Sequence, residues 1–497
     1  MSRAATGVTL AGAVVAVVAT ISGCRAPLSG AGAGAGSAGA LTEEPCTGIP
    51  VAEARCLRLT VHENQAERRG RTISLRIVVL PATGTDRARR EHDAIVYLAG
   101  GPGQAATELI GDSSLAGDDL RARRDVVFAD QRGTGGSNPL ICQFYGPPDQ
   151  PQTYFDTFLP IERVRACRSK LERTSDLAQY TTSASVEDLE AIRAALEYPQ
   201  LTLIGGSYGT RLAMEYVRRY EPRVRAVILD SAVTPANHAP ENFGRLAAQA
   251  LDGLIDECLA DAECASAFPA IREEARQVFD RLRRGPVTAG VAHPAARRPA
   301  EVTLTRDHVA EAIRYLMYSS RGASRVPLYL HEAFNGNFSP IAGFLIRWRA
   351  KGTFDGLYLS ITCAEDVPLV ARDAAERDDP TYLGGYRVRQ QRAACAEWPR
   401  GARHEASGLP VKSAVPILLT SGLLDPVTPS ENGDTIARTL SHSLHLRVPS
   451  SGHSPVGLDG LDCLADIKRA FIERARTDGL DTSCVDRISR PGFVTAR

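Results

Sequence analysis

The sequence predicts an α/β fold: a doubly wound, mostly parallel sheet that carries an inserted, mainly helical cap domain. Short apolar, β-branched segments bounded by Gly, Pro or Asp alternate with amphipathic helical patterns, as a parallel sheet covered on both faces requires. A mainly helical stretch interrupts this alternation from about residue 235 to 352, and strand patterns resume near Ile417. The chain has 497 residues, of which 43% are hydrophobic, so it can bury a large core.

The sheet is predicted from largely hydrophobic runs with the pattern of buried strands. These runs lie at residues 94–98, 126–129, 201–205, 224–229, 416–420 and 444–448. Residues 185–198 have the pattern of an amphipathic helix, which Ser185 would cap and Pro199 would follow. A second helix is expected at residues 208–220, directly after the strand at 201–205. This alternation of strand and helix predicts the doubly wound arrangement.

The insertion is expected to be a cap domain. Apolar residues recur at helical spacing over residues 246–259, 271–282 and 307–317. Residues 284–300 are rich in Pro, Ala and Arg and indicate a surface loop. An insertion between core strands would lie above the carboxyl edge of the sheet, where open α/β sheets bind ligands. The expected domains are a first core part at 45–234, the cap and its return segment at 235–400, and a second core part at 401–497.

The N-terminal residues predict export. Arg3 precedes an apolar run at residues 8–21, which suits a signal peptide and is shorter than the ~20 residues of a membrane span. The run ends in Ile-Ser-Gly-Cys and resembles a bacterial lipobox, so we expect a lipoprotein-type signal peptide at 1–24 and lipidation of Cys24. Residues 25–44 are expected to be a flexible Ala/Gly/Ser tether. Ordinary secretion with cleavage nearby is the alternative, so the expected location is the cell envelope, the periplasm or the medium.

The number of cysteines agrees with export. Without Cys24, ten of the 11 cysteines remain, and an exported chain favours their pairing as disulfides. We expect neighbouring cysteines to pair: Cys46 with Cys56, Cys142 with Cys167, Cys258 with Cys264, Cys363 with Cys395, and Cys463 with Cys484. A zinc site is the alternative, but the sequence lacks the Cys-x-x-Cys spacing that is typical of one.

The charge balance disfavours some classes of partner. The 58 basic and 58 acidic side chains cancel, which leaves no excess of cations for nucleic acid or for an anionic membrane surface. Aromatic residues make up 6% of the chain, which disfavours a surface that stacks single-stranded bases. Membrane attachment is therefore expected through the lipid anchor only. The sequence leaves the oligomeric state open.

A Gly-x-Ser-x-Gly motif at residues 205–209 lies between a predicted strand and a predicted helix. This is the context of a nucleophile elbow, a turn so tight that the neighbours of the serine must lack bulk. The motif therefore predicts Ser207 as the nucleophile of a hydrolase. A glycine-rich turn in a non-catalytic α/β protein is the alternative.

A serine nucleophile needs a histidine base and a carboxylate, which follow it in the order Ser, Asp, His in this arrangement. Of the ten histidines, His453 lies just after the last predicted strand, where a loop can bring its ring over the serine. Asp425 follows the preceding strand and would hold the tautomer of His453. Asp230, at the end of the strand at 224–229, is the alternative carboxylate.

Backbone amides are expected to stabilise the oxyanion. One is the amide of Tyr208, directly after the nucleophile, and the other comes from a loop after an earlier strand. Residues 99–103, Ala-Gly-Gly-Pro-Gly, follow the strand at 94–98 and allow close approach of the backbone. Gly101 is the expected second donor, and a plain tight turn is the alternative interpretation of this loop.

Three motifs stand out along this framework: Gly-Gly-Pro-Gly at 100–103, Asp-Gln-Arg-Gly-Thr-Gly-Gly-Ser at 130–137, and Gly-Ser-Tyr-Gly at 206–209. Together they resemble the proline iminopeptidase and tripeptidyl aminopeptidase family of α/β-hydrolases. The ending, with Asp-Pro-Val-Thr-Pro at 425–429 and Gly-His at 452–453, is similar to the tripeptidyl aminopeptidase branch. The resemblance spans about residues 95–456 and implies the α/β-hydrolase fold. It also implies release of short peptides from a free N-terminus by an acyl-enzyme route, without a metal or an organic cofactor.

Two features depart from the family. Proline iminopeptidases carry a histidine before Gly-Gly-Pro-Gly, whereas this chain has Ala99, which favours the tripeptidyl branch. A Trp-rich acidic motif for the substrate amine is also missing. An ammonium group needs a carboxylate partner, and Glu365 and Asp366 are the candidates because Cys363 would anchor their loop. An ordinary acidic pair on the surface is the alternative, and the residue preference beside the cleaved bond stays open.

The leading hypothesis is a serine peptidase of the cell envelope whose substrate is a peptide with a free N-terminus. An esterase or lipase is the alternative, since the same three residues serve both chemistries. A pocket with a carboxylate at its far end would favour a peptide, and a wholly apolar pocket would favour an ester. A non-catalytic binding protein with this fold is disfavoured because Ser207, Asp425 and His453 are all present.

Overall fold

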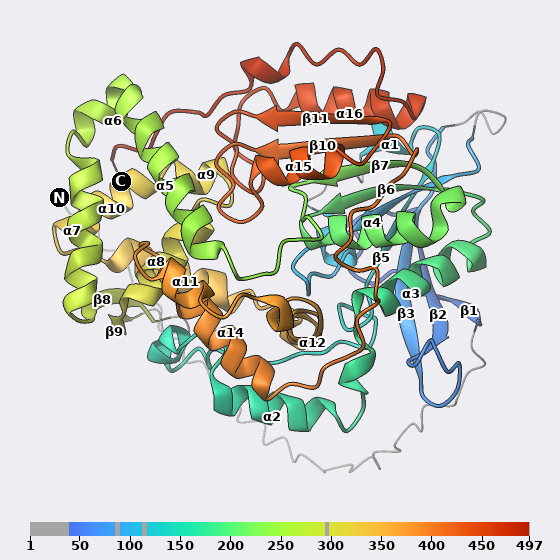
Figure 1. The fold of residues 1–497 in the computed structure, drawn as a ribbon, viewed down its shortest axis with the longest axis horizontal. Helices are drawn as coiled ribbons and strands as arrows, with labels where there is room; N and C mark the ends of the chain where they lie inside the picture. The colour runs from blue at the N-terminus through green and yellow to red at the C-terminus, as the bar shows by residue number, and fades with distance from the viewer. Residues whose placement is uncertain (1–38, 85–89, 112–116, 294–297, 497) are drawn as a thin grey trace, which may run out of the picture. The chain divides into compact units, whose positions relative to one another are not determined.

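A nine-stranded sheet forms the centre of the part of the chain that the structure describes (Figure 1). The structure is a computed structural model, and it describes residues 39–84, 90–111, 117–293 and 298–496. Across the sheet, the strands lie in the order β1-β2-β3-β5-β4-β6-β7-β10-β11. In this order their bounds are Leu41–Glu44, Arg55–His62, Thr72–Leu80, Asp125–Ala129, Ala94–Leu98, Leu201–Gly206, Val224–Asp230, Ile417–Gly422 and Ser443–Val448.

The strands from β5 to β11 in this order run parallel to one another, whereas β1, β2 and β3 pair antiparallel with their neighbours. Because parallel strands end at the same edge of a sheet, the loops after β4, β6, β10 and β11 emerge together. All six strands that the sequence predicts are present, with ends that shift by at most two residues. The predicted doubly wound, mostly parallel α/β fold is confirmed.

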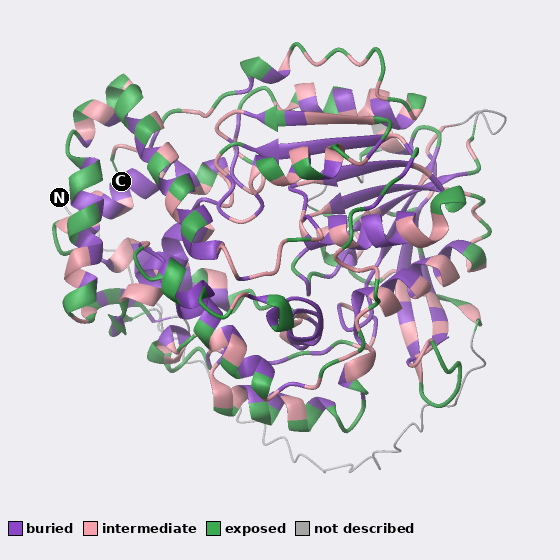
Figure 2. Ribbon diagram, viewed as in Figure 1, coloured by how far each residue is buried: buried purple, intermediate pink, exposed green. Residues whose placement is uncertain are grey.

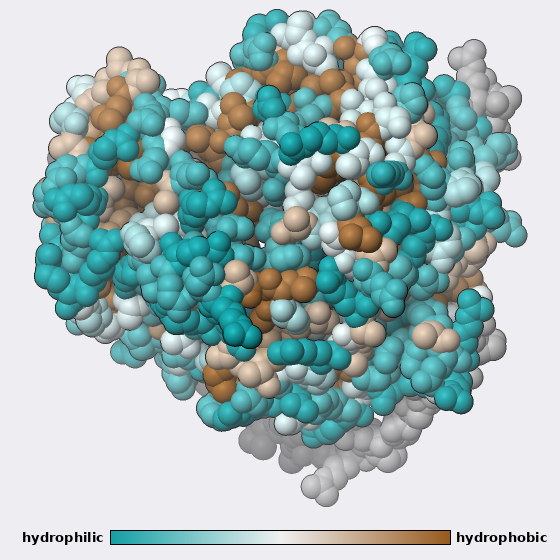
Figure 3. Space-filling view, in the orientation of Figure 1, coloured by the Kyte–Doolittle hydropathy of each residue, from teal (hydrophilic) through white to brown (hydrophobic). Residues whose placement is uncertain are grey.

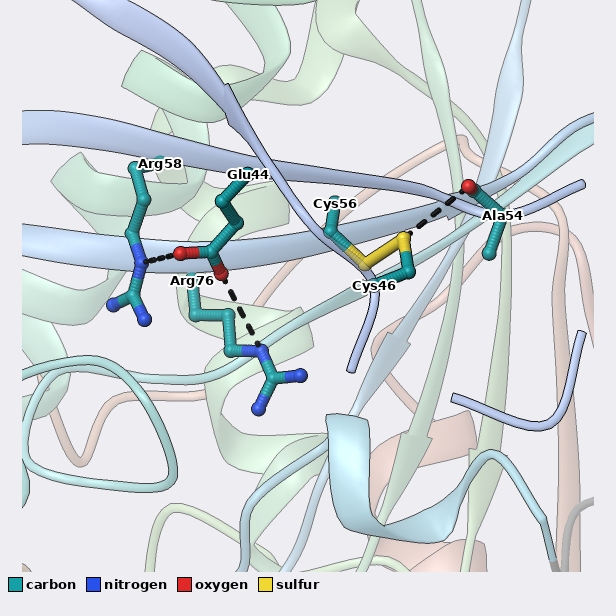
Figure 4. The surroundings of a disulfide bond; sticks show 6 residues. All are labelled: Glu44, Cys46, Ala54, Cys56, Arg58 and Arg76. Carbon is teal, nitrogen blue, oxygen red and sulfur yellow. Dashed lines mark hydrogen bonds and ion pairs between the residues drawn. A yellow bond between two sulfur atoms is a disulfide. The ribbon is translucent and has the colours of Figure 1, made fainter. Parts of the chain in front are cut away.

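The antiparallel strands β1, β2 and β3 are not among the strands expected from the sequence. β1 also corrects the expected tether, because residues 41–44 lie within the range 25–44 and yet pair with β2. Glu44 forms ion pairs with Arg58 at 2.7 Å and with Arg76 at 3.8 Å, and the Cys46–Cys56 disulfide lies beside them (Figure 4). These contacts hold β1 at the edge of the sheet. Residues 25–38 of the expected tether lie outside the described residues.

Helices cover both faces of the sheet, and the strands between them are largely buried (Figure 2). Three helices pack on one face: α3 (Thr182–Ala195), α4 (Tyr208–Tyr220) and α15 (Ser430–Ala437). α16 (Asp462–Arg474) packs on the other face, where the short α1 (Asp118–Arg121) also lies. Because helices cover both faces of the sheet, its strands must be apolar on both faces, which explains their continuous hydrophobic runs.

The helices beside the predicted elbow differ in how well their starts could be predicted. α4 has the bounds that the sequence predicts, whereas α3 begins three residues before the expected cap, Ser185. The true cap is Thr181, whose hydroxyl accepts a hydrogen bond from the Ala184 amide at 3.2 Å. Ser185 is instead buried inside the helix. Both residues are good N-caps, and packing against the sheet decides between them.

The insertion between β7 and β10 is mainly helical, as expected. Its helices are α5 (Phe243–Ala260), α6 (Ala262–Ala267), α7 (Ile271–Arg284), α8 (Arg306–Leu316), α9 (Ser320–Ala323), α10 (Val326–Phe334), α11 (Ser339–Ala350), α12 (Asp355–Glu365), α13 (Ala374–Asp378) and α14 (Tyr386–Ala396). Helices α5 to α11 surround an apolar cluster that is separate from the clusters of the sheet. A second cluster joins α12 and α14 to α2 (Ile161–Leu171).

The expected surface loop at residues 284–300 is wrong over β8 (Val287–Ala292), which pairs antiparallel with β9 (Pro299–Leu304). Residues 294–297 of this range lie outside the described residues. In β8, Ala289 and Val291 are buried, whereas Thr288, Gly290 and Ala292 are exposed, which is the alternation of a half-buried strand. Small residues and prolines hide this alternation in the sequence, because they also favour loops.

The surface of the described residues is mostly polar. Figure 3 shows hydrophilic residues over most of this face, with apolar residues gathered in separate patches. In the described ranges, none of the helices combines the length and the apolar character that crossing a bilayer requires. Cys24, the expected site of lipidation, lies outside these ranges.

Candidate active site

Ser207 lies in a tight turn between β6 and α4, at the carboxyl edge of the sheet. Its backbone has a φ of 53° and a ψ of −120°, which is a strained conformation for a residue with a side chain. A Cβ on Gly205 would lie 2.6 Å from Gly209 O, and a Cβ on Gly209 would lie 2.0 Å from Leu98 O. The motif glycines therefore let α4 approach β4, and the turn presents Ser207 at the edge of the sheet.

The ring of His453 is held by Asp425, from the loop that follows β10. His453 Nδ1 donates a hydrogen bond to Asp425 Oδ2 across 2.8 Å. The Asp425 side chain is completely buried and also accepts hydrogen bonds from the amides of Val427 and Thr428, at 2.8 and 2.9 Å, and from the Thr428 hydroxyl at 2.7 Å. Burial alone would raise the pKa of Asp425, but the charge on His453 and these hydrogen bonds hold that pKa below its ordinary value. Asp425 is therefore ionised at neutral pH and keeps a proton on Nδ1.

The alternative carboxylate, Asp230, has other partners. Its side chain forms an ion pair with Lys468 at 2.7 and 2.8 Å, and it accepts a hydrogen bond from the Thr420 hydroxyl. Its backbone carbonyl accepts a hydrogen bond from the Ser207 amide at 2.9 Å. Asp230 therefore supports the turn, and the structure brings Asp425 to His453.

Ser207 and His453 line the same cavity. Within the described residues, no hydrogen bond joins Ser207 Oγ to the His453 ring. Such a bond is often long in an unliganded enzyme and tightens when the substrate binds. Because Asp425 engages Nδ1, Nε2 is the ring nitrogen that is left to accept a proton.

The loop that carries His453 is attached to the helical insertion. The Ser454 amide donates a hydrogen bond to Tyr318 O at 2.7 Å, and the rings of Tyr318 and His453 lie 5.0 Å apart. A Cβ on Gly452 would lie 2.1 Å from Met317 O. This close contact therefore requires a glycine, and the insertion helps to position the candidate base.

The loop after β4 lies against the candidate nucleophile. A Cβ on Gly100 would lie 3.2 Å from Ser207 Cβ. Gly101 has a φ of +108°, where a residue with a side chain would be strained. In the described part of the chain the Gly101 amide donates to no other group, and the Tyr208 amide lies in the first turn of α4, where amides have no helical acceptor. Both predicted amides therefore remain available as donors.

The Asp-Gln-Arg motif at residues 130–137 supports this loop. Gln131 Nε2 donates a hydrogen bond to Ala99 O at 3.0 Å. Arg132 is completely buried and donates two hydrogen bonds of 2.7 Å to Asp188 of α3. Two buried, charge-assisted hydrogen bonds make a rigid link between elements. The motif therefore braces the loop from inside the protein and does not face the cavity.

The cavity has a volume of about 1000 Å³ and lies between the carboxyl edge of the sheet and the helical insertion. Aromatic rings line part of it, among them those of Tyr315, Tyr318, Phe344 and Trp348. The described lining also includes six basic and four acidic residues: Arg211, Arg314, Arg349, Lys351, Arg387 and Lys468, and Asp230, Glu311, Asp355 and Asp366. The cavity is therefore not wholly apolar, and its lining carries an excess of positive charge.

The structure does not support Glu365 and Asp366 as partners of a substrate amine. Asp366 lines the cavity, but it forms an ion pair with Arg211 at 2.8 Å. Glu365 is absent from the described residues that line the cavity, and it accepts hydrogen bonds from the amide and the hydroxyl of Thr182, at 2.7 and 2.6 Å. Glu365 Oε2 also lies 3.8 Å from Arg211. Groups of the protein therefore already occupy both carboxylates, and their role with a substrate amine stays a prediction from the sequence.

Asp355, the first residue of α12, is a cavity carboxylate that the sequence analysis did not identify. Its Oδ1 accepts a hydrogen bond from the Thr353 hydroxyl at 2.7 Å, and no cation among the described residues forms an ion pair with it. Burial raises the pKa of Asp355 to about 6. No sequence motif marks this residue, because its place in the cavity depends on how the insertion folds over the sheet.

The disulfides of the described residues join the neighbouring cysteines that the sequence analysis pairs. The bonds are Cys46–Cys56, Cys142–Cys167, Cys258–Cys264, Cys363–Cys395 and Cys463–Cys484. The Cys363–Cys395 bond joins α12 to α14, two helices that contribute residues to the cavity.

The comparisons with known proteins agree with this geometry. The sequence profile of the α/β-hydrolase fold matches residues 93–458. The chain is 26% identical to serine protease Hip1 of Mycobacterium tuberculosis in an alignment 462 residues long that covers 87% of each chain. It is 29% identical to tripeptidyl aminopeptidase of Streptomyces lividans in an alignment 197 residues long that covers 37% of this chain and 36% of that protein. It is 24% identical to carboxylesterase B of M. tuberculosis in an alignment 450 residues long that covers 83% of this chain and 82% of that protein.

Among solved structures, proline iminopeptidase of Mycobacterium smegmatis matches with a TM-score of 0.40 and 15% sequence identity, over 84% of this chain and 96% of that one. The profile match spans most of the chain and includes Ser207, Asp425 and His453. The resemblance to α/β-hydrolases that the motifs predict is therefore confirmed. The chain belongs to the α/β-hydrolase fold family.

Proposed function

We propose that this serine hydrolase is a peptidase that releases short peptides or single residues from a free N-terminus through an acyl-enzyme. One observation carries the proposal: a single cavity contains both Ser207, in a strained turn, and His453, hydrogen bonded to a buried and ionised Asp425. The relatives named serine protease and tripeptidyl aminopeptidase support a peptide as the substrate.

Acylation follows from these groups. Ser207 Oγ attacks the carbonyl carbon of the peptide bond while His453 Nε2 takes its proton. Asp425 keeps the other ring proton on Nδ1 and stabilises the imidazolium that forms. The amides of Gly101 and Tyr208 donate to the oxyanion, and one such donor contributes about 3–4 kcal/mol in the transition state. The imidazolium then protonates the leaving amine, and the N-terminal part of the peptide remains as an ester on Ser207.

Deacylation uses the same groups in reverse. Water attacks the ester carbonyl while His453 Nε2 takes a proton from it. The imidazolium returns this proton to Ser207 Oγ as the ester bond breaks. The N-terminal fragment leaves as a carboxylic acid, and the site is restored.

Selection of a free N-terminus requires a carboxylate that pairs with the substrate ammonium. Asp355 supports this part of the proposal, because it lines the cavity and forms no ion pair with a described cation. Since the pKa of Asp355 is raised to about 6, it is ionised and able to bind an ammonium group at neutral pH. In this proposal Asp355 replaces Glu365 and Asp366 as the amine partner.

Hydrolysis of carboxylic esters is the second candidate function. The similarity to carboxylesterase B favours it, and the same nucleophile, base and oxyanion donors would cleave an ester. The ten charged residues in the described lining of the cavity favour a peptide, since a pocket for a simple ester is expected to be apolar.

We also infer that the protein is exported. The five disulfides among the described residues support an oxidising compartment. The signal at 1–24 and the acyl anchor on Cys24 remain predictions from the sequence. Metabolic labelling with an alkynyl fatty acid tests them: the unchanged chain is expected to take up the label and a Cys24→Ala chain is not.

A substrate panel tests the proposed function. Aminoacyl and tripeptidyl amides with a free N-terminus are offered beside their N-acetylated forms and beside short-chain esters. We expect cleavage of free-amine peptides, with a loss on the order of 10-fold or more when acetylation removes the ammonium charge. Ester turnover with no cleavage of any free-amine peptide would overturn the peptidase assignment. The Ser207→Ala variant controls for contaminating hydrolases.

A further inference from the structure

Two buried arginines line the cavity without a carboxylate partner. Arg314 of α8 is 2% exposed and Arg387 of α14 is 4% exposed. Neither forms an ion pair with a carboxylate of the described residues, and the buried atoms Arg314 Nε, Arg314 Nη2 and Arg387 Nε have no hydrogen-bond partner there. A buried cation without a counter-charge is strongly unfavourable. These two residues therefore require a further explanation.

Arg349 shows how the same cavity satisfies an arginine with groups of the protein. It donates two hydrogen bonds to Glu311, at 3.0 and 2.7 Å, and its Nη1 donates to two backbone carbonyls at 2.9 Å each. Glu311 is thereby occupied, and a single carboxylate cannot neutralise Arg314 and Arg387 as well. Among the buried cations of the described lining, Arg314 and Arg387 are therefore the two without an ion pair.

Arg314 and Arg387 lie against the same aromatic ring. Their guanidinium carbons are 4.2 and 5.5 Å from the centroid of the Phe243 ring. Arg387 also donates to the hydroxyls of Tyr315 at 3.4 Å and of Tyr358 at 3.2 Å. These aromatic groups orient the two guanidinium groups, but they supply no negative charge. An anion in the cavity that both arginines line would complement the pair.

The arginine pair lies close to the candidate base. The guanidinium carbon of Arg314 is 5.3 Å from the Tyr318 ring, and that ring is 5.0 Å from the His453 ring. An extended peptide covers about 3.3–3.6 Å per residue, so the two distances laid end to end correspond to at most about three residues. One small substrate can therefore reach both Arg314 and the bond that Ser207 attacks.

We propose that Arg314 and Arg387 form a subsite that binds a carboxylate of the substrate. The planar guanidinium group matches the geometry of a carboxylate, and carboxylates are the negatively charged groups of an unmodified peptide at neutral pH. The carboxylate is either an acidic side chain near the cleaved bond or the C-terminus of a short peptide. That the substrate is a peptide rests on the proposed function, whereas the preference for an anion rests on the two arginines.

Calorimetric binding to the Ser207→Ala variant, which is not expected to turn over the probes, tests the subsite. One matched pair of probes, Ala-Ala-Glu amide and Ala-Ala-Gln amide, tests a side-chain carboxylate. The other pair, Ala-Ala-Ala and its C-terminal amide, tests a terminal carboxylate. We expect the acid of one pair to bind about 10- to 100-fold more tightly than its amide, because the amide loses charged hydrogen bonds. Equal binding within both pairs would overturn the proposal.

Substitution of the arginines assigns this difference to the subsite. Arg314→Gln or Arg387→Gln, added to Ser207→Ala, is expected to weaken binding of the acid and to leave binding of the amide nearly unchanged. Arg272→Gln, at an arginine of α7 whose side chain is 49% exposed, is the matched control. Arg314→Lys and Arg387→Lys keep the positive charge, so we expect them to keep part of the preference for the acid over the amide. They replace a glutamine variant that does not fold. An equal loss for acid and amide in a folded variant would make the arginines purely structural.

Hydrolysis assays with the unchanged protein separate this inference from the proposed function. Preference for the acid in binding, without cleavage of any free-amine peptide, would overturn the proposed function and support the subsite. Cleavage of free-amine peptides without that preference would overturn the subsite alone.

Discussion

Asp425 has two tasks in the candidate site: it holds the ring of His453 in place, and it stabilises the positive charge that forms on that ring. The Val427 and Thr428 amides and the Thr428 hydroxyl fix the carboxylate, and its remaining hydrogen bond orients the ring of His453. Because the pKa of Asp425 is held below its ordinary value, the carboxylate stays charged at neutral pH and stabilises the imidazolium. Holding the ring depends largely on the shape of the Asp425 side chain, whereas stabilising the imidazolium depends on its charge. An isosteric amide keeps the shape and removes the charge, so it separates the two tasks.

Asp425→Asn is expected to lower kcat about 10⁴-fold with little change in KM, because an amide favours the wrong tautomer of His453. Steady-state kinetics on the preferred peptide measures this loss. Asp434→Asn is the matched control, since Asp434 forms a hydrogen bond of 2.9 Å with His445 Nδ1 and lies outside the cavity. Similar losses in the two variants would show that Asp425 acts through stability alone.

Asp355 predicts how KM depends on pH. For a peptide with a free N-terminus, KM is expected to fall as the pH rises through about 6, because the raised pKa of Asp355 leaves it protonated below that value and charged above it. Asp355→Asn is expected to abolish this dependence and to raise KM on the order of 10-fold, because an amide cannot pair with the ammonium.

N-acetylated peptides supply the substrate control for this dependence, since they carry no ammonium group. Asp373→Asn supplies the protein control, because the side chain of Asp373 is 69% exposed. An unchanged KM for the free amine in the Asp355→Asn variant would assign the ammonium to another group.

At the scale of elements, the candidate site is built from loops that are supported from outside the site. Gln131 holds the loop after β4 through Ala99 O. The segment after α8 holds the loop of His453 through the hydrogen bond between Ser454 and Tyr318. The insertion is therefore part of the catalytic framework, and a displacement of this segment would also displace the base.

Gly452→Ala tests this connection. The new Cβ would lie 2.1 Å from Met317 O, so the His453 loop has to move away from the insertion. We expect kcat to fall while the chain remains folded, as steady-state kinetics and circular dichroism would measure. Gly492→Ala is the control, since a Cβ there meets no atom within 4 Å. Full activity of the Gly452→Ala variant would show that the base does not depend on this contact.

The Cys363–Cys395 disulfide has a role that the other bonds do not share, because it joins α12 to α14. These helices carry Asp355 and Arg387. Replacing both cysteines by serine is expected to cost about 3–4 kcal/mol of stability, by the entropy of the closed loop, and to raise KM. Thermal unfolding and steady-state kinetics measure the two effects.

The control for this change is the double serine variant at Cys46 and Cys56, because no described residue of β1 or β2 lines the cavity. That bond closes a shorter loop, 10 residues against 32 in sequence separation. We therefore expect a smaller loss of stability and an unchanged KM. An equal rise in KM for both pairs would remove the special role of the α12–α14 link.

At the scale of the whole molecule, the parts that the sequence predicts depend on local pattern and chain order. The parallel strands are uniformly apolar because helices cover both faces, so each is visible on its own. The elbow is a short motif in a fixed context. His453 and Asp425 follow from their places after the last two strands, and neighbouring cysteines pair because short loops bring them together.

The parts that the sequence does not predict depend on contacts between distant segments. Arg58 and Arg76 interrupt the apolar pattern of β2 and β3, and their partner Glu44 comes from a segment that is mostly Ala, Gly and Ser before it. The sequence also does not show that Arg211, on α4, reaches the acidic pair Glu365 and Asp366 at the end of α12. The two cavity arginines lie on helices that are separated by 69 residues of chain, and no motif links them.

Every step of the proposed mechanism requires that Ser207 is the nucleophile and that His453 is its base. Labelling with a fluorophosphonate, followed by peptide mapping of the intact and the modified protein, is the sharpest test of this claim. We expect one adduct per chain, on Ser207, with no adduct in Ser207→Ala and strongly slowed labelling in His453→Ala. An adduct on another residue, or peptide hydrolysis by a folded Ser207→Ala protein at the rate of the unchanged protein, would contradict the claim.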